Sequence, residues 1–281
     1  MKKINYKKIS NRILFLILIL LSTVVVYTIV TGIMYMKDSN HVQNELEEIK
    51  DLLDMEDDFV DPIAEPKEGE ISENLTDIDR TGIYWDYLNT DLLNVDIPTL
   101  RNKNSDTKGW LQVKGTYVNY PFVQTSNNEY YLTHSFSKTT NGAGWVFADY
   151  RNNFDELDKN TVIYAHGRFD KTMFGSLKKI FDPKWQNDPQ NHFVYLSTEE
   201  ENTLWQVFSI YHIPTTSDYI KIQFTNDEEF LSFAHNLLNR SIYDFHTTIN
   251  ESDKILTLST CLNNEDKIVL HAKLIKSEMK F

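Results

Sequence analysis

The hydrophobic and polar positions divide the first 80 residues into three stretches. Residues 13–35 are almost wholly apolar, and about 20 apolar residues suffice for a helix to cross a bilayer. Between residue 38 and about residue 58, apolar residues recur at helical spacing among acidic ones, which predicts a stalk helix. Residues 59–78 combine proline, glycine and many acids with few large apolar groups. Such a composition buries too little surface to offset the entropy of ordering, so it predicts a disordered spacer.

The pattern changes after residue 83. Residues 83–102 are rich in aromatic residues and leucine and are divided by Pro98, which predicts two short helices. Short aromatic and β-branched runs with turn residues between them then predict eight strands: 109–115, 117–124, 144–150, 161–165, 193–197, 204–211, 254–260 and 267–275. Two helices are expected among them, near 173–180 and over 227–239. Many short strands with few helices indicate a mainly β fold, a closed or nearly closed β-barrel.

The apolar segment has two interpretations, an uncleaved anchor and a cleaved signal peptide. A signal peptide has an apolar core of only about 7–15 residues followed by a small-residue cleavage site, and this run is longer and lacks such a site. The anchor is therefore favoured. Basic residues precede it and acids follow it, which predicts a single-pass membrane protein with a cytoplasmic N-terminus and an extracellular domain.

These patterns predict four regions along the chain: a basic cytoplasmic tail (1–12), a transmembrane anchor (13–35), an acidic extracellular stalk and spacer (36–80), and one domain with a substantial core (81–281). The formal net charge of −13 is concentrated in the third region. No clustered basic face indicates a nucleic-acid partner. Scattered histidines and one cysteine give no metal-ligand spacing, so neither a metal nor another cofactor is expected.

Two residues that follow predicted strands are candidates for chemistry. Cys261, the only cysteine, ends an alternating run and is followed by a turn. A lone thiol cannot form an internal disulfide, so Cys261 is buried filler, a partner for another chain, or a nucleophile. His166 also stands where a strand ends, and it is either a structural or surface histidine or the imidazole that favours a thiolate. Position alone leaves these alternatives open.

Lys267 begins the last predicted strand, directly after the turn that carries Cys261. A cation there is able to stabilise the oxyanion of an acyl intermediate. The alternative is an ordinary solvated lysine.

An ordered set of motifs resembles the class B sortases, the cysteine transpeptidases of Gram-positive surfaces. The segments Asn-Thr-Val-Ile-Tyr-Ala-His-Gly (160–167) and Leu-Thr-Leu-Ser-Thr-Cys-Leu (256–262) resemble the two active-site strands of that family. Other segments resemble class B sequences in order: Asn-Ser-Asp-Thr-Lys-Gly-Trp-Leu (104–111), Tyr-Pro-Phe-Val-Gln (120–124), Asn-Glu-Tyr-Tyr-Leu (128–132), Ala-Asp-Tyr-Arg-Asn (148–152), Met-Phe-Gly-Ser-Leu (173–177) and the helix at 227–239. The resemblance covers roughly residues 83–277.

This resemblance implies an eight-stranded sortase-type β-barrel with N-terminal helices and a helix between strands 6 and 7, preceded by a single transmembrane helix. Cys261 would cleave a C-terminal sorting signal and form a thioacyl intermediate, and His166 would protonate the leaving amine and deprotonate the incoming one. The implied partners are a surface protein or pilin that bears the signal, and an acceptor amine from a peptidoglycan precursor or a pilin lysine.

The sequence departs from the family at Lys267, where the family has an arginine, and the turn before it is shorter than usual. Lysine lacks the flat, five-donor fork of arginine, so reduced or altered activity is expected. Arg168 is a weaker candidate for a substitute donor. Cell-wall anchoring and pilin polymerisation both fit the residues. Two other functions compete: a catalytically weakened or inactive barrel that acts as a surface binding module, and a cysteine hydrolase.

Overall fold

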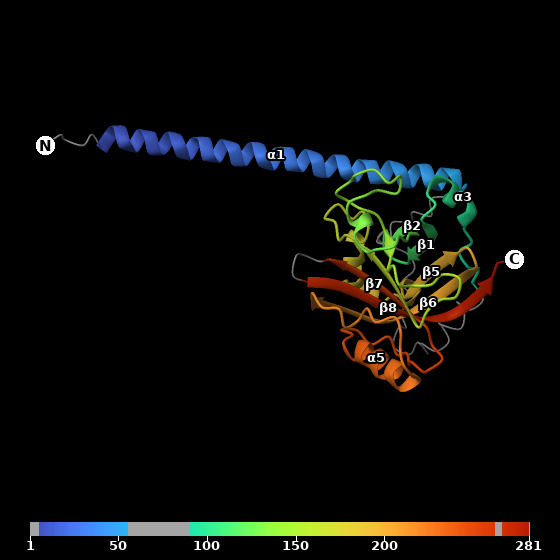
Figure 1. Cartoon of the computed structure of the whole chain (residues 1–281). Coiled ribbons are helices and arrows are strands. Elements are labelled where there is room, and N and C mark those ends of the chain that lie inside the picture. Colours follow the sequence, from blue (N-terminus) through green and yellow to red (C-terminus); the bar gives the residue numbers. More distant parts are fainter. Residues whose placement is uncertain (1–5, 56–89, 262–265, 281) are drawn as a thin grey trace, which may run out of the picture.

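The computed structural model describes residues 6–55, 90–261 and 266–280, and for residues 6–12 and Cys261 only the backbone. Eight strands form a closed barrel in the order β1-β2-β3-β4-β7-β8-β6-β5 (Figure 1). Their bounds are β1 Thr107–Val113, β2 Asn119–Val123, β3 Phe147–Ala148, β4 Asn160–Ala165, β5 Phe193–Thr198, β6 Glu201–Pro214, β7 Ile255–Cys261 and β8 Asp266–Met279. All eight predicted strands occur and the barrel is closed as expected, but the strand predicted over 144–150 is a strand only at Phe147–Ala148.

The barrel is filled by large side chains. Trp110, Trp145, Trp205, Phe122 and Phe174 are fully buried within one hydrophobic cluster or against it. Each of these aromatic side chains removes a large apolar area from water. Burial of these side chains accounts for the stability of the barrel without a disulfide.

Helix α5 (Asp227–Asn239) lies between β6 and β7 in the chain and has the predicted bounds. The Asn226 side chain caps it by accepting a hydrogen bond from the Glu229 amide at 2.9 Å. Phe230, Phe233 and Leu237 form its buried stripe and join a second hydrophobic cluster on the outside of the barrel. The spacing of these residues is that of one helical face. The predicted helix between strands 6 and 7 is confirmed.

The shorter helices differ in part from the expectation. Over 83–102 two helices were expected; residues 83–89 lie outside the described part, residues 90–96 are not helical, and α3 (Ile97–Lys103) is the second helix. Pro98 lies in its first turn, where no backbone donor is needed. The helix expected near 173–180 is a 3-10 helix, η2 (Gly175–Phe181). The remaining short elements are η1 (Tyr130–Leu132), α4 (Pro183–Gln186) and η3 (Pro189–Asn191).

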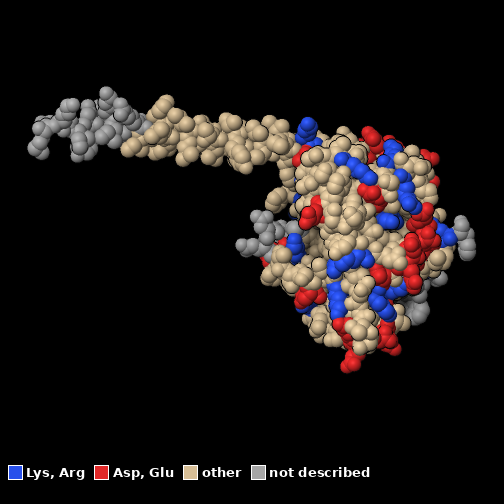
Figure 2. Space-filling model, viewed as in Figure 1, with Lys and Arg blue, Asp and Glu red and all other residues tan. Residues whose placement is uncertain are grey.

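Helix α1 (Tyr6–Leu52) joins the apolar run and the predicted stalk in one unbroken helix of 47 residues (Figure 1). Its free segment, residues 13–34, extends away from the barrel, and Figure 2 shows no charged side chain on it. This helix is long and apolar enough to cross a membrane. Its docked segment, residues 35–52, packs on the barrel, with Val42 and Ile49 in the main core. The predicted spacer at 59–78 lies outside the described residues.

A buried histidine makes folding sensitive to acid. His271 on β8 is fully buried, with Nε2 2.8 Å from Tyr211 Oη and Nδ1 2.9 Å from Thr257 Oγ1. Burial, with a smaller effect of the nearby Arg240 charge, lowers the pKa of His271 from 6.5 to about 3. Between these two values the unfolded chain binds a proton that the folded chain does not. The free energy of unfolding therefore decreases as the pH falls through this window.

We expect His271→Gln, which cannot titrate, to flatten this dependence. Between pH 6.5 and about pH 5, His271 should reduce the free energy of unfolding of the native chain by about 2 kcal/mol, at about 1.4 kcal/mol per pH unit. Urea unfolding of both full-length proteins in detergent micelles measures the difference. Parallel pH curves for the two proteins would show that His271 does not cause the acid sensitivity.

Candidate active site

The pairing of β4 with β7 brings two candidate residues to one edge of the barrel. The strands are parallel, and Ala165 is the partner of Thr260 at their ends. The next residues along the two strands are His166 and Cys261, so they follow the same rung of the ladder. The register is supported by a buried side-chain pair, since Thr257 Oγ1 donates to Asn160 Oδ1 at 2.7 Å.

Lys267 lies across from Cys261. In the antiparallel pair β7–β8 these two residues are Cα partners, and directly opposite residues in such a pair are nearest neighbours between strands. The Lys267 side chain is partly buried. The turn that joins the two strands, residues 262–265, lies outside the described residues. The three predicted site residues thus come from three adjacent strands or strand ends.

The His166 ring is oriented by a hydrogen bond to a backbone carbonyl, a contact that residue types do not predict. Nε2 lies 2.8 Å from the Leu132 carbonyl oxygen, and because a carbonyl only accepts, Nε2 is the nitrogen that donates. Gly144, at φ +61°, lies against the same turn: a Cβ at this position would be 3.1 Å from His166 Cδ2 and 2.4 Å from the Tyr131 oxygen. A side chain there would displace the wall behind the imidazole.

A buried carboxylate stabilises the strand pair that carries His166. Asp149, just after β3, accepts hydrogen bonds from Tyr164 Oη on β4 at 2.9 Å and from Arg151 Nη2 at 2.7 Å. Burial raises the pKa of this carboxyl, but the hydrogen bonds from Arg151, Tyr164 and Asn128 outweigh it, and the pKa is below its usual value. The motif at 148–152 therefore stabilises the β3–β4 edge, and nothing assigns it a chemical step.

Arg168 is bound to α1 and does not face the predicted site as a free donor. Its side chain is 7% exposed. The guanidinium lies 3.9 Å from the centre of the Tyr35 ring, donates to Ser39 Oγ at 2.7 Å, and pairs with Asp170 at 3.3 Å. These contacts hold the guanidinium against α1, whereas Lys267 is the Cα partner of Cys261.

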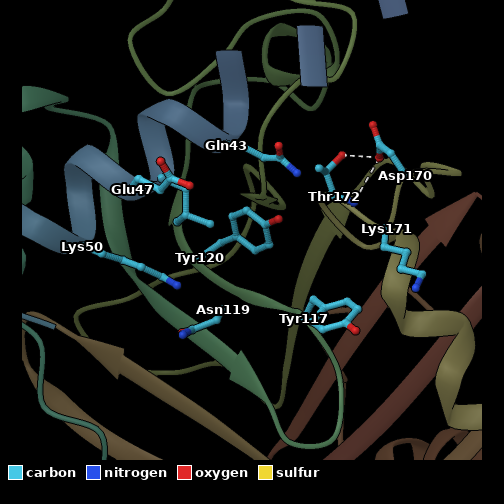
Figure 3. Close-up of a pocket in the computed structure, with 10 residues that line it drawn as sticks. Gln43, Glu47, Lys50, Tyr117, Asn119, Tyr120, Asp170, Lys171 and Thr172 are labelled. Carbon is cyan, nitrogen blue, oxygen red and sulfur yellow. Dashed lines mark hydrogen bonds between the residues drawn. The ribbon is translucent and has the colours of Figure 1, made fainter. Parts of the chain in front are cut away.

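A cavity of about 410 Å³ lies between α1 and the barrel (Figure 3). Gln43, Glu47 and Lys50 reach it from the helix, and Tyr117 and Lys171 line the barrel side. Ten described residues line the cavity, and His166 and Lys267 are not among them. The cavity is therefore separate from the predicted catalytic edge, although the loop after His166 forms one of its walls.

Metal ligation finds no support in the described part of the chain, where no group of three or more His, Cys, Asp or Glu side chains is placed to hold an ion. The backbone pairing of β4, β7 and β8 brings a cysteine, a histidine and a lysine to one edge of the barrel, and these residue types are ones that acyl transfer uses.

Known proteins resemble this chain in sequence and in fold. A family model described as the sortase domain matches residues 111–275. Sortase B of Listeria monocytogenes serovar 1/2a is 33% identical over 186 residues, which are 64% of this chain and 74% of that protein. The structure of sortase B from Clostridium perfringens has a TM-score of 0.61 at 31% identity and covers 64% of this chain and 100% of that one. The Staphylococcus aureus sortase B–substrate complex has a TM-score of 0.60 at 28% identity and covers 70% and 92%.

The matched region contains every strand from β2 to β7, the last residues of β1 and most of β8. It also contains the helix between strands 6 and 7 that the motifs predict. The expected class and barrel are both confirmed. The chain belongs to the sortase family, within class B, and is a cysteine transpeptidase.

Proposed function

We propose that Cys261 is the nucleophile and His166 the general acid and base of this transpeptidase. The Cys261 thiolate attacks the carbonyl carbon of an amide in a sorting signal, the C–N bond breaks, and the leaving amine takes a proton from His166. An acceptor amine then attacks the thioester, loses its proton to His166 and releases the thiolate. The supporting observation is the parallel register of β4 and β7, in which both residues follow the same rung.

The histidine contact supports a division of roles within the imidazole. Nε2 donates to the Leu132 carbonyl and orients the ring. Nδ1 is then the nitrogen that exchanges the proton with the substrate amine. A ring fixed in one tautomer needs no reorganisation when the leaving amine forms.

Lys267 is proposed to stabilise the oxyanion of the tetrahedral intermediate in place of an arginine. Its position opposite Cys261 supports this role. An ammonium binds an oxyanion as a point charge, whereas a guanidinium donates two parallel hydrogen bonds.

We therefore expect Lys267→Arg to raise kcat/KM by about tenfold, the value of one added hydrogen bond to a charged group. Lys267→Gln should lower it by about a hundredfold, as loss of an oxyanion donor does elsewhere. Steady-state kinetics with a sorting peptide measures both. Lys273→Arg is the matched control, because Lys273 lies on the same strand but donates to the Thr248 carbonyl. Equal or lower turnover of Lys267→Arg would contradict the role.

Membrane anchoring is proposed through the free segment of α1, with residues 1–12 in the cytoplasm and the domain from residue 81 outside the cell. The apolar length of the helix and the basic residues before it support this topology. The substrates would then be a surface protein or pilin that bears a sorting signal and an acceptor amine at the outer face. The S. aureus relative has been solved as a sortase B–substrate complex, which supports substrate binding on this fold.

One experiment tests the reaction and separates its competitors. Full-length protein in detergent is incubated with a panel of sorting peptides, with and without amines, and intact mass is measured. A Cys261 thioacyl adduct that an amine converts into an amide product is the expected result. An adduct resolved only by water would indicate a hydrolase, and the absence of any adduct across the panel would indicate a binding module. Competition between a peptidoglycan-type amine and a pilin lysine distinguishes wall anchoring from pilin polymerisation.

A further inference from the structure

The loop that follows His166 contacts α1 at the end of its apolar run. The Phe169 and Asp170 amides donate to Tyr35 Oη at 3.0 and 3.4 Å, and the Arg168 guanidinium lies over the Tyr35 ring. These contacts place the Phe169 backbone beside Tyr35 along the helix.

Tyr35 lies at the level where a bilayer ends. The apolar run begins at Ile13, and the first charged residue after it is Lys37. At about 1.5 Å per residue, a hydrocarbon core of about 30 Å uses about 20 residues of this run. Tyr35 then falls within a helical turn of the hydrocarbon boundary, in the interfacial layer where tyrosine and tryptophan are enriched.

Phe169 is an exposed aromatic side chain in that layer. Its side chain is 88% exposed. The next most exposed large hydrophobic residue in the described part outside α1 is Met279, at 58%. A single exposed apolar residue is ordinary on a protein surface. Phe169 differs because its backbone amide donates to Tyr35 Oη, at the end of the apolar run of α1.

We propose that Phe169 inserts into the interface of the membrane that holds α1, an inference that rests on the proposed anchoring. Phe169 and α1 then bind the same bilayer at two points and fix the orientation of the barrel. The C-terminus, at the end of β8, lies on the side away from the free segment of α1 (Figure 1). The start of β8, beside Cys261, therefore lies toward that segment, and the catalytic edge faces the membrane surface.

A membrane-facing catalytic edge selects its substrates by location. A sorting signal that is still attached to the membrane and an acceptor on a lipid carrier both present their reactive groups near the headgroups. The partner of this surface is the lipid interface itself, and Phe169 is a positioning residue with no contact to the reacting atoms.

The single cysteine of the chain allows a direct test. Cys261→Ala removes it, and Phe169→Cys or Met279→Cys then introduces one site for an environment-sensitive fluorophore. Each full-length variant is reconstituted into vesicles of phosphatidylglycerol and phosphatidylethanolamine that contain a headgroup-labelled nitroxide lipid. We expect the label at 169 to shift to the blue and lose fluorescence to the nitroxide. The label at 279, at the far end of β8, should do neither.

Vesicle flotation separates failure of the anchor from failure of the inference. A protein that does not float with the vesicles would contradict the anchoring proposal. A protein that floats but whose label at 169 behaves like the label at 279 would overturn the contact of Phe169 with lipid. An independent activity test uses Phe169→Ser with Cys261 intact. Turnover of a soluble peptide should be unchanged and turnover of a vesicle-anchored peptide lowered, and an equal effect on both substrates would also overturn the inference.

Discussion

Replacing Cys261 with alanine is expected to abolish adduct formation and to lower transpeptidation by about 10⁴-fold or more. A nucleophile that forms a covalent intermediate has no substitute in the site, and loss of such a residue in other acyl-transfer enzymes has effects of this order. Cys261 is also the only thiol in the chain, so any thioester found on the native protein is assigned without ambiguity. The measurement is product formation together with intact mass after incubation with a sorting peptide.

Two controls show whether the lost activity of Cys261→Ala comes from the missing thiol or from unfolding. Met279→Ala removes an exposed side chain at the far end of the barrel and should leave turnover unchanged. Urea unfolding of Cys261→Ala should match that of the native chain, because the substitution removes one sulfur atom at a strand end. Amide product formed by Cys261→Ala at the native rate would rule out the covalent mechanism.

The second large effect is expected at His166. His166→Gln should lower kcat for a peptide substrate by about 10³-fold, within the range for loss of a general acid. Glutamine has an amide that is able to donate to the Leu132 carbonyl, which now accepts from the ring, so the local fold should persist. Because the leaving amine of a peptide requires a proton and a phenolate leaving group does not, an activated phenyl ester should restore much of the acylation rate.

His134, two residues after Leu132, serves as a control histidine. His134 Nδ1 lies 2.8 Å from the Tyr130 carbonyl oxygen and its ring stacks on Tyr130 at 4.0 Å. His134→Gln should therefore keep most of the activity with both substrates. Equal losses with the peptide and the ester in His166→Gln would mean that His166 does not protonate the leaving group.

Much of the barrel follows from the residue pattern alone. Short aromatic and β-branched runs between turn residues locate all eight strands, and the apolar spacing over 227–239 predicts the bounds of α5. The order in which the strands pair around the barrel does not follow from these local patterns. β4 pairs with β7 although about 90 residues separate them in the chain, and no local pattern encodes that contact. The motif resemblance implies a barrel with two active-site strands, and the structure adds that these two strands pair.

The residues of the proposed site can be chosen from the sequence, but the groups that surround them cannot. Cys261 and His166 are visible as residues at the ends of predicted strands. The group that orients the His166 ring is the backbone carbonyl of Leu132. Every residue has such a carbonyl, so the residue type at position 132 does not reveal this contact. The docking of α1 was missed for a related reason: only Val42 and Ile49 are fully buried among its acids, so the segment looks like a solvated stalk.

The docked segment of α1 has a consequence for any shortened form of this enzyme that lacks it. Glu45 accepts hydrogen bonds from Ser135 Oγ and the Ser137 amide, and Tyr35 and Ser39 satisfy Arg168. Shedding of the domain by cleavage after Leu52 would leave these buried polar groups and an apolar strip exposed together. The helix is thus a structural part of the folded domain as well as a candidate anchor, and a soluble ectodomain that omits it is a different folding unit.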